Sequence, residues 1–192
     1  MKINETREKI LSVADRLFGR FGFQKTSMDE IAKIARKAKG SLYYHFPSKE
    51  DLFREVVQNE MVEIKSKLSA VVSNSELSAE GRLKKYMLTR LEVMQYVTNY
   101  HETIQSGEID HFEFMGDIRS GFDVWEKQRL ISIINEGVER EEFHIELNTE
   151  VLSEMFIMIM KGLEIPFFIQ GKYREYLPHI DGMANIIIKG MK

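Results

Sequence analysis

Apolar residues recur at steps of three and four along nearly the whole chain, which is the spacing of one face of an α-helix. Only three prolines interrupt this pattern, and no alternation of apolar and polar residues predicts a strand. The sequence therefore predicts an all-α fold of about nine helices. The clearest apolar faces consist of Ile10, Ala14, Leu17, Phe18 and Phe21, and of Leu52, Phe53, Val56, Val57, Met61, Ile64 and Leu68.

Capping residues predict where several helices begin and end. Gly22 is expected to end the first helix, and Ser27 with Glu30 three positions later has the spacing of a capping box. Ser48 and Asn148 are expected to cap later helices. In the second helix, Ile31, Ile34 and Ala35 are expected to be buried. Further helices are expected at about 79–104, 118–142, 149–170 and 175–190, with a looser stretch at about 107–116. Pro166 is expected to kink or end the helix at 149–170, and Pro178 is expected in the first turn of the last helix.

Residues 69–81 predict a break along the chain, because they contain four serines, an asparagine and a glycine. This composition separates a small N-terminal head from a larger helical body. We expect a head of residues 1–48 and a body of residues 49–192, with residues 49–69 as a helix connecting the two.

The charge is distributed unevenly between these parts. The whole chain has a net charge of −3, which argues against nucleic-acid binding when taken alone. Residues 1–49, however, carry 11 Lys and Arg against 5 Asp and Glu, whereas the remaining residues carry 16 against 25. A basic head on an acidic body is typical of a protein that meets phosphates with one end only.

Several classes of protein and site are not expected. The chain has no cysteine, which excludes disulfides and thiolate chemistry, and its charged start lacks the apolar core of a signal peptide. The segment His101-Glu102-Thr103-Ile104-Gln105 begins like a zinc-protease motif, but Gln105 stands where the second histidine is required. We expect a soluble, cytoplasmic protein that is not an enzyme and has no metal, cofactor or membrane partner.

The most informative segment is residues 27–49, which predicts two short helices joined by a tight turn. Lys39, Gly40 and Ser41 give the second helix a charge, a close backbone approach and a small hydroxyl at its start. Tyr43 and Tyr44, followed by His45, add long polar tips about one turn later. This is the composition of a recognition helix, the second helix of a helix-turn-helix, whose first residues face base edges in the major groove.

At these residues the chain resembles the TetR family of transcriptional regulators. The resemblance covers about 50 residues, at positions 10–22, 26–35 and 39–53, and includes the run Lys-Gly-Ser-Leu-Tyr-Tyr-His-Phe from Lys39. It implies a DNA-binding regulator that acts as a repressor, with Leu42 and Phe46 packed on Phe18 and Phe21. The implied contacts are Thr26 and Ser27 to a phosphate, Lys39, Gly40, Ser41 and Tyr43 to the major groove, and Tyr44, His45 and Lys49 to the DNA backbone.

The chain departs from the family pattern in the turn itself. Arg36, Lys37 and Ala38 stand where the family usually has a glycine, an apolar residue and a serine or threonine. A side chain in a left-handed turn conformation costs about 1 kcal/mol relative to glycine, and the lost cap costs about 1 kcal/mol more. In return, Arg36 and Lys37 place two extra cations beside the groove, so we expect stronger salt-dependent, sequence-independent binding.

The resemblance further implies an effector cavity in the body, and 11 methionines fit such an adaptable apolar pocket. A Met and aromatic set at helical spacing is also typical of an ordinary core, and an acidic body could instead dock a protein partner. Both alternatives stay open. The candidate pocket residues are Tyr96, Tyr100, His101, Gln105, Phe112, Met115, Phe122, Trp125, Phe156 and Met160.

A single recognition helix reads too few base pairs for useful specificity, so we expect a homodimer on a palindromic operator. The resemblance implies that the last two helices form the dimer interface, where Gly162 would let two backbones approach closely. The alternative for each side chain is a place in the intramolecular core. The candidates are Met155, Ile159, Gly162, Leu163 and Pro166 on one helix, and Ile180, Met183 and Ile187 on the other.

Overall fold

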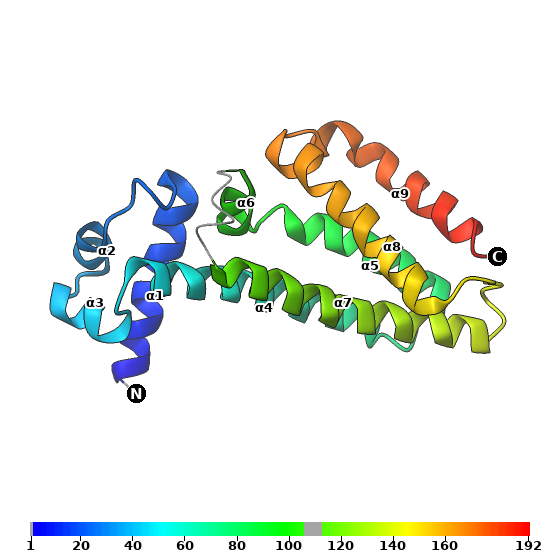
Figure 1. The fold of residues 1–192 in the computed structure, drawn as a ribbon, viewed down its shortest axis with the longest axis horizontal. Coiled ribbons are helices and arrows are strands. Elements are labelled where there is room, and N and C mark those ends of the chain that lie inside the picture. Colours follow the sequence, from blue (N-terminus) through cyan, green and yellow to red (C-terminus); the bar gives the residue numbers. More distant parts are fainter. Residues whose placement is uncertain (1, 106–112) are drawn as a thin grey trace. The chain divides into compact units, whose positions relative to one another are not determined.

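The computed structural model describes residues 2–105 and 113–192, and within these ranges the chain is helical and has no strand. The expected all-α class is therefore confirmed. None of the helices in this described part combines the length and the hydropathy that crossing a bilayer requires. In chain order (Figure 1) the elements are α1 (Lys2–Phe21), α2 (Met28–Ala35), α3 (Lys39–His45), α4 (Lys49–Val72), α5 (Ala79–Met94), α6 (Thr98–Gln105), α7 (Glu113–Glu139), α8 (Thr149–Gly162), the π-helical η2 (Ile165–Ile169) and α9 (Tyr173–Lys189).

The chain divides into two compact units. The N-terminal unit consists of Met1–Val62 and Val97–Gly116, and the C-terminal unit consists of Glu63–Tyr96 and Asp117–Lys192. The N-terminal unit thus includes α6, which follows the head by more than thirty positions in the sequence. The expected boundary after residue 48, between a DNA-binding head and a body, stays a prediction because the two compact units describe packing and not function.

In the N-terminal unit, α1, α2 and α3 cluster around the beginning of α4 (Figure 1). The centre of this cluster is aromatic, with the ring of Phe53 lying 5.1 Å from that of Phe18 and 5.0 Å from that of Phe23. α1 ends before Gly22, which adopts φ +85°, a conformation that glycine reaches without steric cost. The expected caps are present: Ser27 and Glu30 form a capping box, and the Ser48 hydroxyl accepts from the Asp51 amide.

Two residues expected in this core are exposed instead. Phe21, the last residue of α1, keeps 49% of its surface accessible because the chain turns at Gly22 and Phe23 fills the core in its place. Ile34 keeps 48% because Met28, Ile31, Ala32 and Ala35 define the buried face of α2, and Ile34 lies at the edge of that face. The anchors of α3 are therefore Leu42 and Phe46 packed in a core that contains Phe18 but not Phe21.

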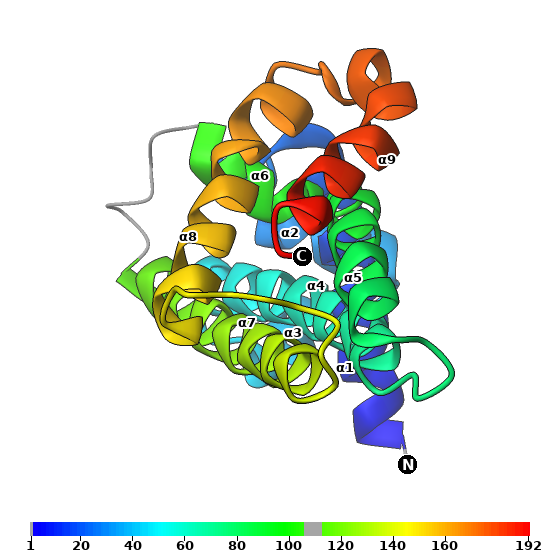
Figure 2. The same cartoon turned by 90° about the vertical axis from the view of Figure 1, so that its right-hand side faces the viewer.

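In the C-terminal unit, α9 packs along α5, and the two lie side by side in both views (Figures 1 and 2). α5 contributes buried Leu83, Met87 and Leu91. After α7 the chain turns at Glu141, which has φ +61°, and buries Phe143 against Gly137. A side chain at Gly137 would overlap the Phe143 ring, so this turn requires a glycine there.

Several helix boundaries differ from the expected ones. The helix expected at 79–104 is two helices, because α5 stops at Met94 and α6 starts at Thr98. The helix expected to reach residue 170 ends at Gly162, and Pro166 lies in the first turn of η2. Pro178 lies inside α9 rather than in its first turn, in an exposed run where water can reach the carbonyl group that loses its amide partner.

The aromatic cluster gives a first prediction. Phe53→Ala removes a fully buried ring from contact with Phe18 and Phe23, so we expect the free energy of unfolding to fall by about 3–5 kcal/mol. Urea denaturation followed by circular dichroism measures this change. Phe21→Ala is the matched control, and its exposed ring should contribute less than about 1 kcal/mol. Equal losses in the two variants would contradict the packing described here.

Candidate nucleic-acid interface

The turn between α2 and α3 has the strained geometry expected from its sequence. Arg36 adopts φ 56° and ψ 46°, and its amide donates to the carbonyl groups of Ala32 and Lys33. Ala38 occupies the N-cap position of α3 and provides no side-chain hydrogen bond. α3 is held instead by its apolar side, because Leu42 and Phe46 are buried. The helix is therefore fixed by packing rather than by capping.

The other side of α3 is open to solvent. Tyr44 exposes 76% of its surface and Tyr43 exposes 41%, both large values for aromatic side chains. A methyl group at Gly40 would meet no other atom of the described chain within 4 Å, so packing within this unit does not require a glycine there. Lys39 is exposed and lies 2.7 Å from the Asp29 carboxylate, which raises the pKa of its ammonium group. This face can receive a large partner at close range.

The two residues expected to contact a phosphate, Thr26 and Ser27, already donate hydrogen bonds within the protein. Thr26 is buried, and its hydroxyl group lies 2.8 Å from the Gly22 carbonyl oxygen and 3.3 Å from that of Leu17, so its single proton is already used. This overturns the expectation that the Thr26 hydroxyl donates to DNA. Ser27 is exposed, but its amide and its hydroxyl both donate to the Glu30 carboxylate, at 3.1 and 3.0 Å. A phosphate at Ser27 would have to displace that carboxylate.

The other residues expected to contact DNA differ in the hydrogen bonds that they make within the unit and in their exposure to solvent. The Lys49 ammonium donates to the carbonyl groups of Phe23 and Thr26 and lies 4.1 Å from the centre of the Phe23 ring, so it also stabilises the turn before α2. The Lys37 ammonium donates to the Thr6 hydroxyl on α1, at 2.9 Å. Arg36 is exposed, and His45 and Ser41 are half-buried. The proposed DNA contacts of all these residues stay predictions.

The beginning of α6 is attached to the head helices by a carboxylate that the sequence did not reveal. Glu60 of α4 accepts from the backbone amides of Asn99 and Tyr100, at 3.1 and 2.9 Å, and so caps α6. The buried Asn99 amide group also donates to Glu60 and to Asp15 of α1, at 2.9 and 2.8 Å. Burial raises the pKa of Glu60 to about 7, against the opposing effect of the amide donors.

A second carboxylate at this junction is that of Glu102, on α6. Glu102 accepts from the Phe23 amide at 2.7 Å, directly beside the turn at Gly22. Gly19 faces the Thr98 hydroxyl so closely that a side chain there would lie 2.7 Å from it. Helices α1, α4 and α6 therefore form one connected junction behind the recognition helix.

Comparison with known proteins agrees with this geometry. Residues 10–56 match the model of the tetR family of bacterial regulatory proteins. The chain is 31% identical over 106 residues to the HTH-type transcriptional regulator QacR of Staphylococcus aureus (55% of this chain, 53% of QacR), and 24% identical over 191 residues to the regulator YdgC of Bacillus subtilis (97% and 93%). A TetR-family regulator from Mesorhizobium loti has the same fold, with a TM-score of 0.81, 19% identity and coverage of 100% and 96%.

The match to the tetR family model lies in residues 10–56, and the whole chain has the fold of the Mesorhizobium loti regulator. The chain spans about half the length of QacR. The relatives are named as transcriptional regulators and not as enzymes. The matched segment contains α2 and α3, the two short helices that the sequence predicted for the helix-turn-helix.

The residues expected to line an effector pocket are divided between the two units. In the N-terminal unit Tyr100, His101 and Met115 are buried, and burial lowers the pKa of His101 to about 4, which keeps its imidazole neutral. In the C-terminal unit Phe122, Phe156 and Met160 are buried and Trp125 is half-buried. Two expectations are wrong, because Tyr96 in the loop after α5 and Gln105 at the end of α6 are exposed; Phe112 lies outside the described residues.

The residues expected in a dimer interface also separate into two groups. Met155, Ile159 and Gly162 are exposed on one side of α8, while Leu163, Pro166, Met183 and Ile187 are half-buried. Ile180 is wrongly assigned, because it is buried on the side of α9 that packs along α5. Exposed Val151 and Met158 extend the apolar row on α8.

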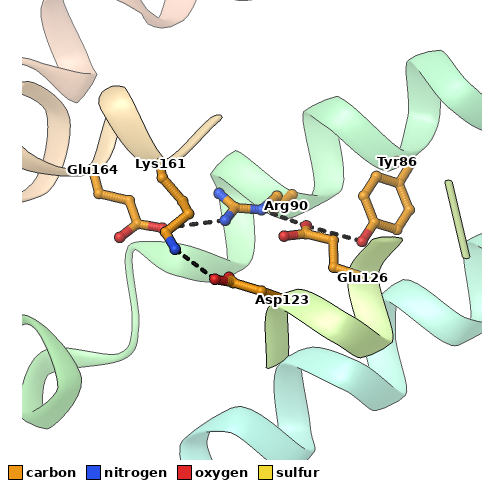
Figure 3. A network of polar contacts seen from close by, with 6 residues as sticks. All are labelled: Tyr86, Arg90, Asp123, Glu126, Lys161 and Glu164. Carbon is orange, nitrogen blue, oxygen red and sulfur yellow. Dashed lines mark hydrogen bonds and ion pairs between the residues drawn. The ribbon is translucent and has the colours of Figure 1, made fainter. Parts of the chain in front are cut away.

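The C-terminal unit contains a buried charged network that the sequence analysis missed (Figure 3). Arg90 of α5 lies 2.6 Å from Glu126 of α7 and 3.2 Å from Glu164, and Tyr86 donates to Glu126 at 3.0 Å. Burial disfavours the charged guanidinium, but the two carboxylates outweigh it and raise the pKa of Arg90. Burying each such ion costs roughly several kcal/mol, which the ion pairs and hydrogen bonds of the network offset.

The junction at Glu60 predicts a pH dependence. Since the folded state binds the Glu60 proton more tightly, the stability that this gives is present at low pH and is lost as the pH rises from about 4.5 to about 7. The Glu60 contribution to the free energy of unfolding should fall by up to about 3 kcal/mol over this range, whereas the lowered pKa of His101 adds a rise over much of the same range. Denaturant titrations at a series of pH values measure it.

The difference between wild type and Glu60→Gln isolates the Glu60 contribution, because the titrating group is gone while His101 is unchanged. Wild type should lose stability relative to Glu60→Gln as the pH rises, whereas Glu63→Gln, three residues further along α4 and exposed, is the control and should follow the wild-type profile. A Glu60→Gln profile that is parallel to the wild-type profile would show that the Glu60 carboxyl does not titrate in this range.

Proposed function

We propose that this protein is a sequence-specific transcriptional regulator, acting as a repressor, that reads operator DNA with α3. The observation that carries this proposal is the contrast between the two sides of α3. Leu42 and Phe46 fix the helix to the core, while Tyr43, Tyr44 and Gly40 present an open face. A rigid helix with an open polar face can enter a major groove without first rearranging.

The charges around α3 support the same proposal. Residues 1–49 carry a net charge of +6 within a chain of net charge −3, so the head attracts phosphates although the whole protein is acidic. Lys39 retains its charge beside Asp29, and Arg36 projects from the turn at the start of the helix. Such cations supply the affinity that does not depend on sequence, and the α3 side chains supply the discrimination.

The regulator is further proposed to be a homodimer on a palindromic operator. The exposed apolar row of Val151, Met155, Met158 and Ile159 on α8 supports this, because such a row is costly to leave in water. Pairing α8 with its copy would cover the row, and exposed Gly162 would permit close approach.

The operator is proposed to be released by a small molecule bound in the body. The buried charged network of the C-terminal unit supports this over control by a protein partner, because a partner would dock on the surface and would leave the network without a role. An effector that favours the released form would weaken operator binding by about 1–3 kcal/mol, and the operator would weaken effector binding equally.

The recognition helix is tested by Tyr44→Ala. This side chain is exposed and holds no part of the core, so the variant should fold normally and bind operator roughly 10-fold more weakly, as expected for loss of one contact. The duplex is obtained by selection from random oligonucleotides with the wild-type protein, and affinity is measured by fluorescence anisotropy. Tyr96→Ala, an equally exposed tyrosine in the C-terminal unit, should bind like wild type.

If no duplex is enriched in the selection, the protein is not a sequence-specific DNA binder and the proposal fails. If Tyr44→Ala binds the selected duplex as tightly as wild type, α3 is not the reading element.

The dimer is tested by Met155→Glu combined with Ile159→Glu. Two carboxylates in the apolar row should convert a dimer into a monomer in light scattering after size exclusion, and should weaken operator binding as well. Val124→Glu, which changes an exposed apolar residue of α7, is the control and should remain dimeric. A wild-type monomer at micromolar concentration would overturn this part of the proposal.

A further inference from the structure

Lys37 lies in the turn that joins α2 to α3, and its backbone closes that turn. Its amide donates to the Ala32 carbonyl at 2.9 Å, and the amide of Arg36 donates to the Lys33 carbonyl at 3.1 Å. This pair of hydrogen bonds is a Schellman motif, in which the residue at the place of Lys37 often makes an apolar contact with the preceding helix. A lysine at such a place needs a separate partner for its charged end.

The side chain of Lys37 finds this partner on α1. Its ammonium donates to the Thr6 hydroxyl at 2.9 Å, across 31 positions of the sequence. Both side chains are half-buried, whereas the neighbouring Arg36 is exposed. Since α1 packs against α2 and α3, the Lys37 ammonium points toward the packed side of these helices. The two cations of the turn therefore differ in direction, although the sequence predicts the same role for both.

The next residue of α1 attaches the opposite end of α3. The guanidinium of Arg7 lies 5.2 Å from the centre of the Phe46 ring, and Phe46 is the residue at which α3 ends. Arg7 also forms an ion pair with Glu55 of α4. A cation over an aromatic face is attracted to it, so this contact favours one position of the helix end. The beginning of α1 thus contacts the recognition helix region at two places, through Thr6 and through Arg7.

The start of α3 depends on such an attachment because its own residues hold it weakly. Arg36 adopts a left-handed conformation that disfavours a side chain, and Ala38 provides no side-chain cap. The first fully buried side chain of the helix is Leu42, so residues 39–41 have no buried anchor of their own. These are the residues that the proposed function places against base edges.

We propose that Lys37 is a positioning residue of the recognition helix, and not the cation beside the groove that the sequence predicts. Its hydrogen bond to Thr6 holds the start of α3 on α1, so that Lys39, Gly40 and Ser41 meet the bases at one fixed angle. This inference rests on the proposed function, because it states how the reading element is held. Without the bond the start of α3 takes several positions, and affinity falls with the population of the one that fits the groove.

Thr6→Val tests this role without changing any charge. Valine has nearly the shape of threonine but lacks the hydroxyl, so the variant should bind the selected duplex roughly 3- to 10-fold more weakly. An unrelated duplex of the same length should bind like wild type, because sequence-independent affinity comes from phosphate contacts. Fluorescence anisotropy measures both. Thr6→Ser, which retains the hydroxyl, is the matched control and should bind both duplexes like wild type.

Equal affinity of Thr6→Val and wild type for the selected duplex would overturn the proposal. An equal loss in Thr6→Val and Thr6→Ser would overturn it as well, since the hydroxyl would then not be the group that matters.

Lys37→Met separates positioning from phosphate contact. A lysine that binds a phosphate contributes about 0.9 to the slope of log affinity against log salt concentration. We expect Lys37→Met to weaken binding of the selected duplex as Thr6→Val does, and to leave that slope unchanged. A slope that is lower by about 0.9 would assign the Lys37 ammonium to the DNA and overturn the proposal.

The double variant Thr6→Val with Lys37→Met tests whether the two residues act as a pair. It should bind the selected duplex no more weakly than the weaker of the two single variants, because one bond can be lost only once. Additive losses would show two independent effects and overturn the proposal. Circular dichroism and thermal unfolding establish that each variant is folded before its affinity is compared.

The failure of this inference differs from the failure of the proposed function. If the wild-type protein enriches no duplex, the proposed function fails and Lys37 has no helix to position for reading. If it enriches a duplex that every folded variant binds as tightly as wild type, the role of Lys37 is refuted and the proposed function stands.

Discussion

The burial of Phe53 against Phe18 and Phe23 is the constraint on which the reading head depends. These three rings come from α1, from the loop after it and from α4, and they define the platform to which Leu42 and Phe46 attach α3. The turn before α3 contains a side chain at positive φ, and the helix lacks a side-chain cap. Packing therefore compensates for unfavourable local geometry, and it leaves the tyrosines free to face outward.

Each unit also contains a buried carboxylate system with a different consequence. At Glu60 the carboxylate accepts from the first amides of α6 and so connects α6 with α1 and α4, which makes the junction sensitive to proton binding. At Glu126 the carboxylate shares one oxygen between two donors and leaves the other unused. The first arrangement connects helices of the N-terminal unit, and the second connects α5, α7 and the segment after α8.

The sequence identified the helix-turn-helix well because its signals are local. The capping box at Ser27, the glycine at position 22 and the run from Lys39 each depend on neighbours within a few positions. The same local reasoning was wrong for Phe21, Ile34 and Thr26, since exposure and hydrogen bonding depend on what packs opposite. Glu60 lies between Val57 and Met61 on the apolar stripe of α4, so its position in the sequence indicated that a carboxylate is buried there. Periodicity alone does not show which groups a buried carboxylate binds.

The sequence by itself determined the helical class, the place of the recognition helix and the basic character of the head, because periodicity, capping and charge are properties of short segments. Only the tertiary structure decided that Glu60 meets Asn99, 39 positions away, and that Arg90 meets Glu126 and Glu164, 36 and 74 positions away. Such pairs form because distant helices bring charges out of water into one place, where each must find a partner. No pattern of neighbouring residues encodes which distant charge that partner will be.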